Sequence, residues 1–351
     1  MTPASIPEPR VAEADLSKAG RTLGTRPAVA VVMPVLNERR HLRAAVEAIL
    51  AQDYAGEMEI VLALGPSTDG TDEVAADLAA ADPRIRTVPN PTGATPCGLN
   101  AAIAATAAAI IVRVDGHSML PPNYVRAAVE ALQSSGADNV GGVMAAEGVT
   151  PFEQAVARAM RSWFGIGGAR FHLGGEAGPV ETVYLGVFRR EMLDRVGGFD
   201  EDMRRAQDWE LNYRIRRAGG TVWFTPEMRV TYRPRADLRA LSKQFFKTGQ
   251  WRREVTRRHR GTASARYLAA PAAVVGVVGG TVLALTGHRI GLLGPLGYVA
   301  AVAAGSAATS KGLPPAGAAA LPVVYTTMHL SWGLGYLLSP RDLAEPSDLE
   351  R

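Results

Sequence analysis

Cysteine is almost absent from this chain of 351 residues, which has a single one, Cys97. One cysteine excludes an intrachain disulfide framework and a cluster of thiolate metal ligands, and we interpret it as a small buried residue. Residues 1–27 carry prolines and mixed charges but no apolar run long enough for the hydrophobic region of a signal peptide. We expect them to form a flexible cytosolic leader.

Two phosphate-binding motifs are missing as well. The glycine-rich dinucleotide fingerprint would have to follow the first strand, where the sequence reads PVLNER, and GxxxxGK[ST] occurs nowhere. The phosphates of a bound nucleotide must therefore be neutralised by another group. A divalent metal held by a carboxylate is the usual substitute.

Charged residues are scarce, at 21% of the chain against 47% hydrophobic residues. This composition suffices for one large domain or two modest ones and excludes a disordered protein. The formal net charge of +4 would suit nucleic acid, but arginines cluster between residues 252 and 266, directly before an uncharged stretch. That placement favours a membrane surface, and we expect no nucleic-acid partner.

Acidic and basic residues are missing altogether from residues 267–287, 290–310 and 312–340. Each segment is about as long as the roughly 20 residues that a spanning helix needs. Their many alanines and glycines favour a packed bundle of about three spans, with a soluble helical domain as the alternative. The arginines before them predict a multi-pass protein of the cell membrane with residues 1–266 in the cytoplasm. Three crossings would put the polar tail, residues 341–351, on the far side.

Between residues 28 and 145, apolar runs alternate with helical patterns. We expect strands at residues 28–35, 60–64, 85–88 and 110–114, and helices at residues 42–50, 71–81 and 97–107. Such alternation predicts an α/β fold whose mostly parallel sheet has helices on both faces. The α/β domain should cover residues 28–235, followed by a basic, amphipathic interfacial segment at 236–266 and the membrane region at 267–340.

Polar or turn-forming residues follow all four expected strands. They are Asn37-Glu38, Ser67-Thr68-Asp69-Gly70, Pro91-Thr92-Gly93 and Asp115-Gly116-His117. Ligands on parallel sheets bind beyond the carboxyl ends of the strands, so their convergence predicts a binding site. Taken singly, Asn37 could cap the next helix, and Asp69 or Asp115 could belong to an ordinary turn.

The stretch around Asp115, AIIVRVDGHSML, resembles the D-x-D region of family-2 glycosyltransferases, which have the GT-A fold. The likeness covers about residues 28–260. It includes VVMPVLNERRHLRAAVEAILAQDY, GPSTDGTDEVA, NPTGATPCGLNAAI and YLGVFRREMLDRVGGFDEDMRRAQDWELNYRIRRAG. Membrane-anchored members that build succinoglycan-type exopolysaccharides look especially similar, since they pair V-R-V-D-x-H with C-terminal spans.

The resemblance implies a metal-dependent, inverting hexosyltransferase with residues 28–235 as its GT-A catalytic domain. Asp115 would hold Mn²⁺ or Mg²⁺ against the donor's diphosphate. His117 stands where many members have a second acid, so it either ligates the metal, which would favour Mn²⁺, or bonds to a phosphate. The expected nucleotide-sugar contacts are Asn37, Glu38, Asp69, Gly93 and Asp115.

Asp208 occupies the position of the family's catalytic Asp, with Gln207 in place of the usual preceding Glu. A carboxylate there would take the proton of the acceptor hydroxyl. The pattern of the following residues predicts that Asp208 opens a helix which ends at Gly219-Gly220, so the alternative role of Asp208 is an N-cap.

Aromatic and basic residues alternate in the segment KQFFKTGQWRREVTRRHR. Gln250-Trp251-Arg252 preserves part of the Q-x-x-R-W motif of processive synthases, and Arg252 or Arg253 would clamp the diphosphate. The alternative is an interfacial helix with its arginines on anionic lipids. The residues expected to contact acceptor or diphosphate are Gln207, Trp209, Gln250, Trp251 and Arg252. For Trp209 and Glu210, a core tryptophan and a solvated glutamate are alternatives.

The sequence therefore predicts transfer of a hexose from a UDP-sugar to a lipid-linked, polyprenyl-diphosphate saccharide in exopolysaccharide biosynthesis. The incomplete Q-x-x-R-W motif and the three spans, all after the catalytic domain, weigh against a processive synthase. The other alternative is a non-catalytic, membrane-anchored subunit that binds nucleotide sugars. The oligomeric state is left open.

Overall fold

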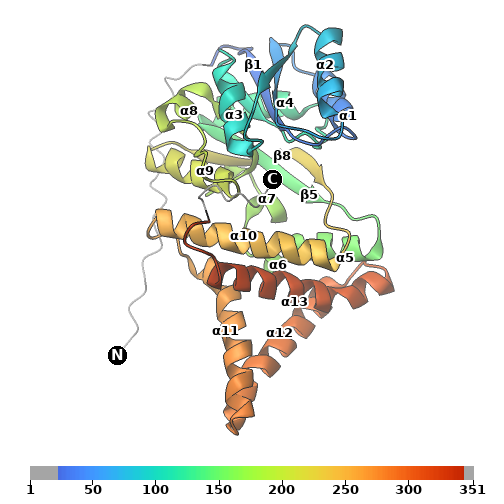
Figure 1. Cartoon of the computed structure of the whole chain (residues 1–351), viewed down its shortest axis with the longest axis vertical. Coiled ribbons are helices and arrows are strands. Elements are labelled where there is room, and N and C mark those ends of the chain that lie inside the picture. Colours follow the sequence, from blue (N-terminus) through green and yellow to red (C-terminus); the bar gives the residue numbers. More distant parts are fainter. Residues whose placement is uncertain (1–22, 344–351) are drawn as a thin grey trace.

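The computed structural model describes residues 23–343, and its centre is one eight-stranded sheet (Figure 1). The strands are β1 (Val29–Val35), β2 (Met58–Leu64), β3 (Ile85–Pro89), β4 (Ile110–Arg113), β5 (Asn139–Ala146), β6 (Gly178–Pro179), β7 (Tyr184–Arg189) and β8 (Val222–Tyr232). Their order is β3-β2-β1-β4-β7-β5-β8-β6. Strands β1 to β4 are parallel, as are β5 and β8, whereas β7 runs antiparallel between β4 and β5. The predicted mostly parallel sheet is confirmed.

Helices cover both faces of the sheet, because successive side chains of a buried strand point to opposite sides. Val31 and Met33 of β1 share one core with α1 (Leu42–Leu50), α2 (Thr71–Ala81) and α4 (Tyr124–Ser135). Ala30 and Val32 share the other with α3 (Thr95–Ala104), α8 (Arg190–Val196) and α9 (Gln207–Arg217). The expected strands and helices are all present, and α3 begins two residues before the expected start. Cys97, on α3, is half-buried rather than buried.

Two long helices lie side by side beneath the sheet domain (Figure 1). They are α10 (Leu238–Arg258) and α13 (Pro315–Leu337), and glycines bring their backbones into contact. A Cβ atom on Gly249 of α10 would lie 2.1 Å from the carbonyl oxygen of Trp332, and one on Gly335 of α13 would lie 2.0 Å from that of Phe246. Helix α13 also packs against α5 (Pro151–Met160), while the short helices α6 (Trp163–Ile166) and α7 (Arg170–Leu173) follow α5 in the chain.

Helices α11 (Ala265–Leu285) and α12 (Leu293–Thr309) extend away from this body and converge at their far ends (Figure 1). Glycines again allow close contact, since a Cβ atom on Gly294 would lie 2.1 Å from the carbonyl oxygen of Gly276. Many apolar side chains on the two helices are exposed, Leu285 by 83% and Leu293 by 71%. Within residues 23–343, Ala265–Leu285 and Arg289–Thr309 are the two helices long and apolar enough to cross a membrane.

The third expected span, residues 312–340, requires a correction. It forms α13, which buries Leu321, Tyr325 and Met328 in a core shared with α5 and α10. Side chains of α13 are thus packed inside the protein, and the described residues contain two candidate spans rather than three.

The expected position of the polar tail changes with the number of spans. Arg257 of α10 donates a hydrogen bond to the carbonyl oxygen of Ser339 at 2.6 Å, so the chain after α13 lies against α10. Two crossings would return the chain to the side from which it started. Residues 344–351 of the tail and residues 1–22 of the expected leader lie outside the described part of the chain.

Candidate active site

The segments that follow β1 and β2 are joined by hydrogen bonds. Asn37 has a φ of 55°, and its side-chain oxygen accepts a hydrogen bond from the backbone N–H of Thr68 at 2.8 Å. The N–H of Asn37 donates to the hydroxyl of Ser67 at 3.1 Å. Asn37 therefore does not cap α1, whose N-cap residue is His41.

Asp69 and Gly93 lie at the same edge of the sheet. One carboxylate oxygen of Asp69 accepts from the backbone N–H of Arg39 at 3.2 Å, and the other accepts from that of Thr71 at 3.1 Å. The Thr71 hydroxyl also bonds to Asp69 and holds the pKa of its carboxyl below the usual range. Gly93, at a φ of 64°, is so close to Pro66 that an added Cβ would lie 3.2 Å from its ring. The expected convergence of these strand ends is therefore present.

Glu38 and His117 form a pair across the ends of β1 and β4. The Glu38 carboxylate lies 2.8 Å from Nδ1 of His117, and this hydrogen bond raises the pKa of His117. A carboxylate on Nδ1 fixes the ring's tautomer and leaves Nε2 as the nitrogen able to bind a metal. Glu38 was expected at the nucleotide, and the structure places it beside the candidate metal ligand.

Arg113, which sequence reasoning missed, connects the two principal carboxylates. It is the last residue of β4, and its side chain is only 5% exposed. Its Nη2 donates to Asp115 at 3.0 Å, and its Nη1 donates to Asp208. Asp115 and Asp208 come from a strand end and a distant helix, yet they share one guanidinium. The available signal was an arginine at the end of an otherwise apolar strand.

Asp208 lies in the first turn of α9 with its carboxylate turned toward the sheet. The N-cap of α9 is Ala206, at a φ of 58°, and no side chain caps this helix. The alternative of Asp208 as an N-cap is therefore wrong. Leu211 and Ile215 of α9 are buried against the sheet, and the helix ends before Gly219 as predicted, so Asp208 is carried by a firmly packed element.

Arg252 of α10 lies between two aromatic rings. Its guanidinium carbon is 3.8 Å from the centre of the Trp209 ring and 3.6 Å from that of Tyr267. Arg252 is 5% exposed, and burial lowers its pKa. Nη2 donates to the carbonyl oxygen of Thr262 at 2.6 Å, whereas Nε and Nη1 have no hydrogen-bond partner among the described residues. A buried cation with two unused donors is a candidate site for an anion.

The other expected acceptor or diphosphate contacts lie in varied surroundings. Gln207 is buried beside Asp208, and Gln250 is half-buried on α10. Trp251 is packed in a small core with Met203 and Val255. Its indole therefore belongs to the protein interior.

Glu210 and Arg253 are also engaged within the protein. Glu210 is 1% exposed and bonds to Arg214 at 2.7 Å and to His259 at 3.0 Å, so it is neither solvated nor open to an acceptor. Arg253 lies over the ring of Tyr336 on α13, with its guanidinium carbon 5.1 Å from the ring centre. Of the two arginines proposed as a clamp, Arg252 is the one in contact with α9.

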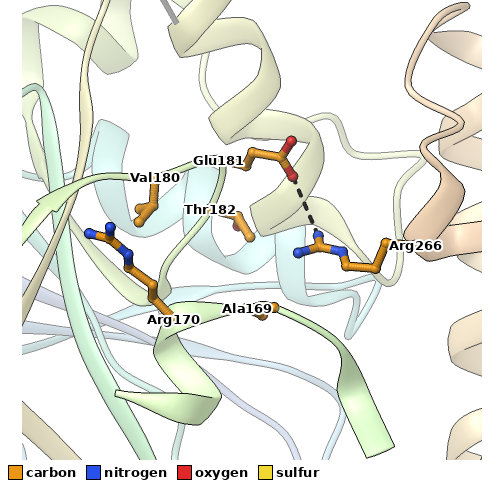
Figure 2. A pocket seen from close by; sticks show the side chains of 7 residues that line it. Ala169, Arg170, Val180, Glu181, Thr182 and Arg266 are labelled. Carbon is orange, nitrogen blue, oxygen red and sulfur yellow. Dashed lines mark hydrogen bonds and ion pairs between the residues drawn. The ribbon is translucent and has the colours of Figure 1, made fainter. Parts of the chain in front are cut away.

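A cavity of about 260 Å³ lies where α7, the segment before β7 and the start of α11 meet. Figure 2 shows Arg170 and Arg266 among its lining residues, with Glu181 paired to Arg266 at 3.4 Å. Thr182 of this cavity accepts a hydrogen bond from Asn212 of α9 at 2.9 Å. The cavity therefore adjoins the helix that carries Asp208.

The residues after β4 fit a divalent cation that is completed by substrate. Among residues 23–343, no three His, Cys, Asp or Glu side chains gather into a metal site made by protein alone. Asp115 has one oxygen held by Arg113, and its second oxygen accepts no hydrogen bond from a described residue. Together with Nε2 of His117 it would supply two ligands, and Mg²⁺ commonly takes one or two protein groups plus phosphates and waters.

Known proteins are similar to this chain in sequence and in fold. The profile of "Glycosyl transferase family 2" matches residues 30–197. The succinoglycan biosynthesis protein ExoA of Rhizobium meliloti (strain 1021) is 32% identical over 311 residues, which cover 87% of this chain and 93% of that protein.

Solved structures show the shared fold. A mannosyltransferase from Pyrobaculum calidifontis in complex with GDP-Man and Mn²⁺ has a TM-score of 0.59 at 21% identity, over 90% of this chain and 88% of its own. TarS 1-349 of S. aureus has a TM-score of 0.50 at 12% identity, over 88% and 90%. With the sequence relationship and the GT-A fold established, the chain belongs to glycosyltransferase family 2.

Proposed function

We propose that this protein is an inverting, metal-dependent hexosyltransferase that uses a UDP-sugar and a lipid-linked saccharide acceptor in exopolysaccharide biosynthesis. The observation that carries the proposal is the Arg113 bridge, which puts a candidate metal ligand and a candidate base in one site. The similarity to a succinoglycan biosynthesis protein supports the biosynthetic role.

The donor would bind at the carboxyl edge of the sheet. Asn37, Asp69 and Gly93 follow β1, β2 and β3, on the side where parallel α/β sheets bind ligands, and would contact the base and ribose of the nucleotide. Asp115 and His117 would hold Mn²⁺ or Mg²⁺, and Glu38 keeps the His117 ring oriented. The cation, when bound, supplies positive charge to the departing diphosphate.

Asp208 would act as the base on the acceptor side. The acceptor hydroxyl oxygen attacks the anomeric carbon, its proton passes to the Asp208 carboxylate, and the bond to the diphosphate breaks with its electron pair on the leaving oxygen. Attack opposite the leaving group inverts the anomeric centre. Arg113 holds one Asp208 oxygen, so the carboxylate is fixed before the acceptor arrives.

The acceptor's phosphate would bind between α9 and the start of α11. Arg252 offers two unused donors under Trp209, and the neighbouring cavity has Arg170 and Arg266 in its wall. Arginine is suited to phosphate because its N–H groups carry a permanent positive charge and make strong hydrogen bonds to phosphate oxygens. The saccharide would extend from there along Trp209 to Asp208.

Membrane attachment would come from the α11–α12 hairpin. Its exposed apolar side chains would lie in the bilayer. The helical segments Ala265–Leu285 and Arg289–Thr309 have 21 residues each and are about 31 Å long, close to the thickness of the hydrocarbon core. Arginines at the end of α10 precede the hairpin, which supports a cytoplasmic catalytic domain.

Purified full-length protein tests this function. It would be incubated with Mn²⁺, a synthetic polyprenyl-diphosphate saccharide and a panel of UDP- and GDP-sugars, with nucleotide release and product mass as readouts. We expect release of UDP and addition of one hexose, only when acceptor is present. Use of a GDP-sugar alone would overturn the donor, and a long polymer would identify a processive synthase. UDP binding without transfer from any donor would indicate a non-catalytic subunit.

A further inference from the structure

Arg113 is a buried cation in the middle of the sheet. Its strand β4 pairs with β1 and β7 in the middle of the sheet, and its side chain is 5% exposed. An apolar residue would fill such a position without the desolvation penalty of a charge. The guanidinium instead reaches both Asp115 and Asp208, and its Nε has no partner among the described residues. The charge of Arg113 is therefore explained by its contacts with the two carboxylates.

We infer that Arg113 has two opposed effects on the reaction: it positions Asp208 for proton transfer and competes with the divalent cation for Asp115. The inference rests on the proposed function. Arg113 acts through the carboxylates of Asp115 and Asp208, so it is a positioning residue rather than a catalytic one.

The competition follows from the geometry at Asp115. One carboxylate oxygen accepts a hydrogen bond from Nη2 of Arg113 at 3.0 Å, so a cation at Asp115 shares its ligand with a permanent positive charge. Two cations this close repel each other, and the partly buried site screens that repulsion poorly. Metal binding without nucleotide is thereby weakened. The diphosphate of the donor brings negative charge, so metal and donor should bind together.

The positioning effect follows from the contact at Asp208. Asp208 is 28% exposed, in the first turn of α9, and Arg113 donates a hydrogen bond to its carboxylate. Loss of this contact frees the carboxylate to rotate toward solvent. Turnover at saturating Mn²⁺ and donor should then fall, because the candidate base is no longer held in place.

The test compares Arg113→Gln with Arg113→Lys. Mn²⁺ binding to nucleotide-free protein is measured by electron paramagnetic resonance, and kcat and donor KM by transfer to the lipid-linked acceptor. For Arg113→Gln we expect Mn²⁺ to bind about tenfold more tightly, while kcat at saturating Mn²⁺ and donor falls about 100-fold. For Arg113→Lys, which keeps the charge but loses the fork, we expect unchanged Mn²⁺ affinity and a lower kcat.

The matched control is Arg126→Gln, because Arg126 on α4 also pairs with two carboxylates, Asp53 and Glu130, on the surface. It should change neither quantity. Weaker or unchanged Mn²⁺ binding in Arg113→Gln would overturn the competition, since a purely structural role cannot tighten metal binding. If that variant does not fold, Arg113→Lys with the kcat of the wild type would overturn the positioning.

The two readouts separate this inference from the proposed function. Mn²⁺ binding requires no sugar donor, so it tests the contact between Arg113 and Asp115 even if the wild-type protein transfers no hexose. Absence of transfer by the wild type would count against the proposed function alone.

Discussion

The surroundings of Asp208 suit a base more than a structural acid. Its carboxylate makes no helix cap, is partly exposed and is held by Arg113. We expect Asp208→Asn to lower the transfer rate by about 10²–10⁴, because an amide cannot accept the proton. UDP binding, measured by calorimetry, should be unchanged, since the expected donor contacts follow the strands of the sheet and Asp208 lies on α9. Transfer at the wild-type rate would contradict the assignment.

His172 on α7 makes stability depend on pH. Burial lowers its pKa to about 3, and its Nδ1 has no hydrogen-bond partner among the described residues. The unfolded chain takes up a proton near pH 6.5, which the folded protein excludes, so stability falls as the pH drops below 6.5. The melting temperature of His172→Leu should therefore fall less between pH 7.5 and 5.5 than that of the wild type. The exposed His41→Leu is the control, and parallel curves for wild type and His172→Leu would count against this role.

At the residue scale, the sequence predicted the polar and turn-forming residues at the strand ends better than the residues that form hydrogen bonds with them. Asn37, Asp69, Gly93, Asp115 and His117 meet as expected, because the carboxyl ends of parallel strands share one edge. Arg113 was missed because its distant partner, Asp208, is brought to it only by the packing of α9. Trp251 was expected at the acceptor but packs in a core with Met203 and Val255. The residue type alone does not reveal this, because the burial of an indole depends on which residues the fold brings next to it.

At the scale of elements, the strands and helices before residue 114 follow directly from apolar periodicity. Helix α13 does not, because an uncharged segment rich in alanine and glycine has the same composition whether it faces lipid or protein. The difference lies in its partners: Gly249 on α10 and Gly335 on α13 allow contact between the two backbones. The sequence therefore predicts one span too many, at residues 312–340, because that segment has the same composition as the two candidate spans.

The contact between α10 and α13 gives a prediction at Gly249. A side chain there would clash with the carbonyl of Trp332, so Gly249→Leu should destabilise the protein by about 1–3 kcal/mol or more. Thermal unfolding in detergent, followed by circular dichroism, measures the effect. Gly279→Leu on α11 is the matched control, because an added Cβ there has no neighbour within 4 Å. Equal melting temperatures for both variants would show that the helices do not pack this closely.

At the scale of the whole molecule, the hairpin predicts which parts of the chain share a side of the membrane. In a Cys97→Ser background, His288→Cys at the hairpin tip should react with an impermeant thiol reagent on intact cells. Arg341→Cys, after α13, should react only after permeabilisation, because the two proposed crossings would bring the chain back to the cytoplasm. Labelling of both cysteines on intact cells would indicate a third crossing. Protection of both cysteines on intact cells would show that the hairpin does not cross the membrane.

With the hairpin in the bilayer as proposed, the backbone contact between α10 and α13 would also fix the height of Asp208 above the lipid headgroups. Arg252 of α10 stacks on Trp209 of α9 and on Tyr267 of α11, so we expect Asp208 to stay at one height as the acceptor lengthens. The enzyme should therefore be specific for acceptor length. It should accept a saccharide of one length and reject its own product, whose terminal hydroxyl would lie beyond the Asp208 carboxylate. Comparing kcat/KM for acceptors that differ by one sugar tests this, and equal values would rule it out.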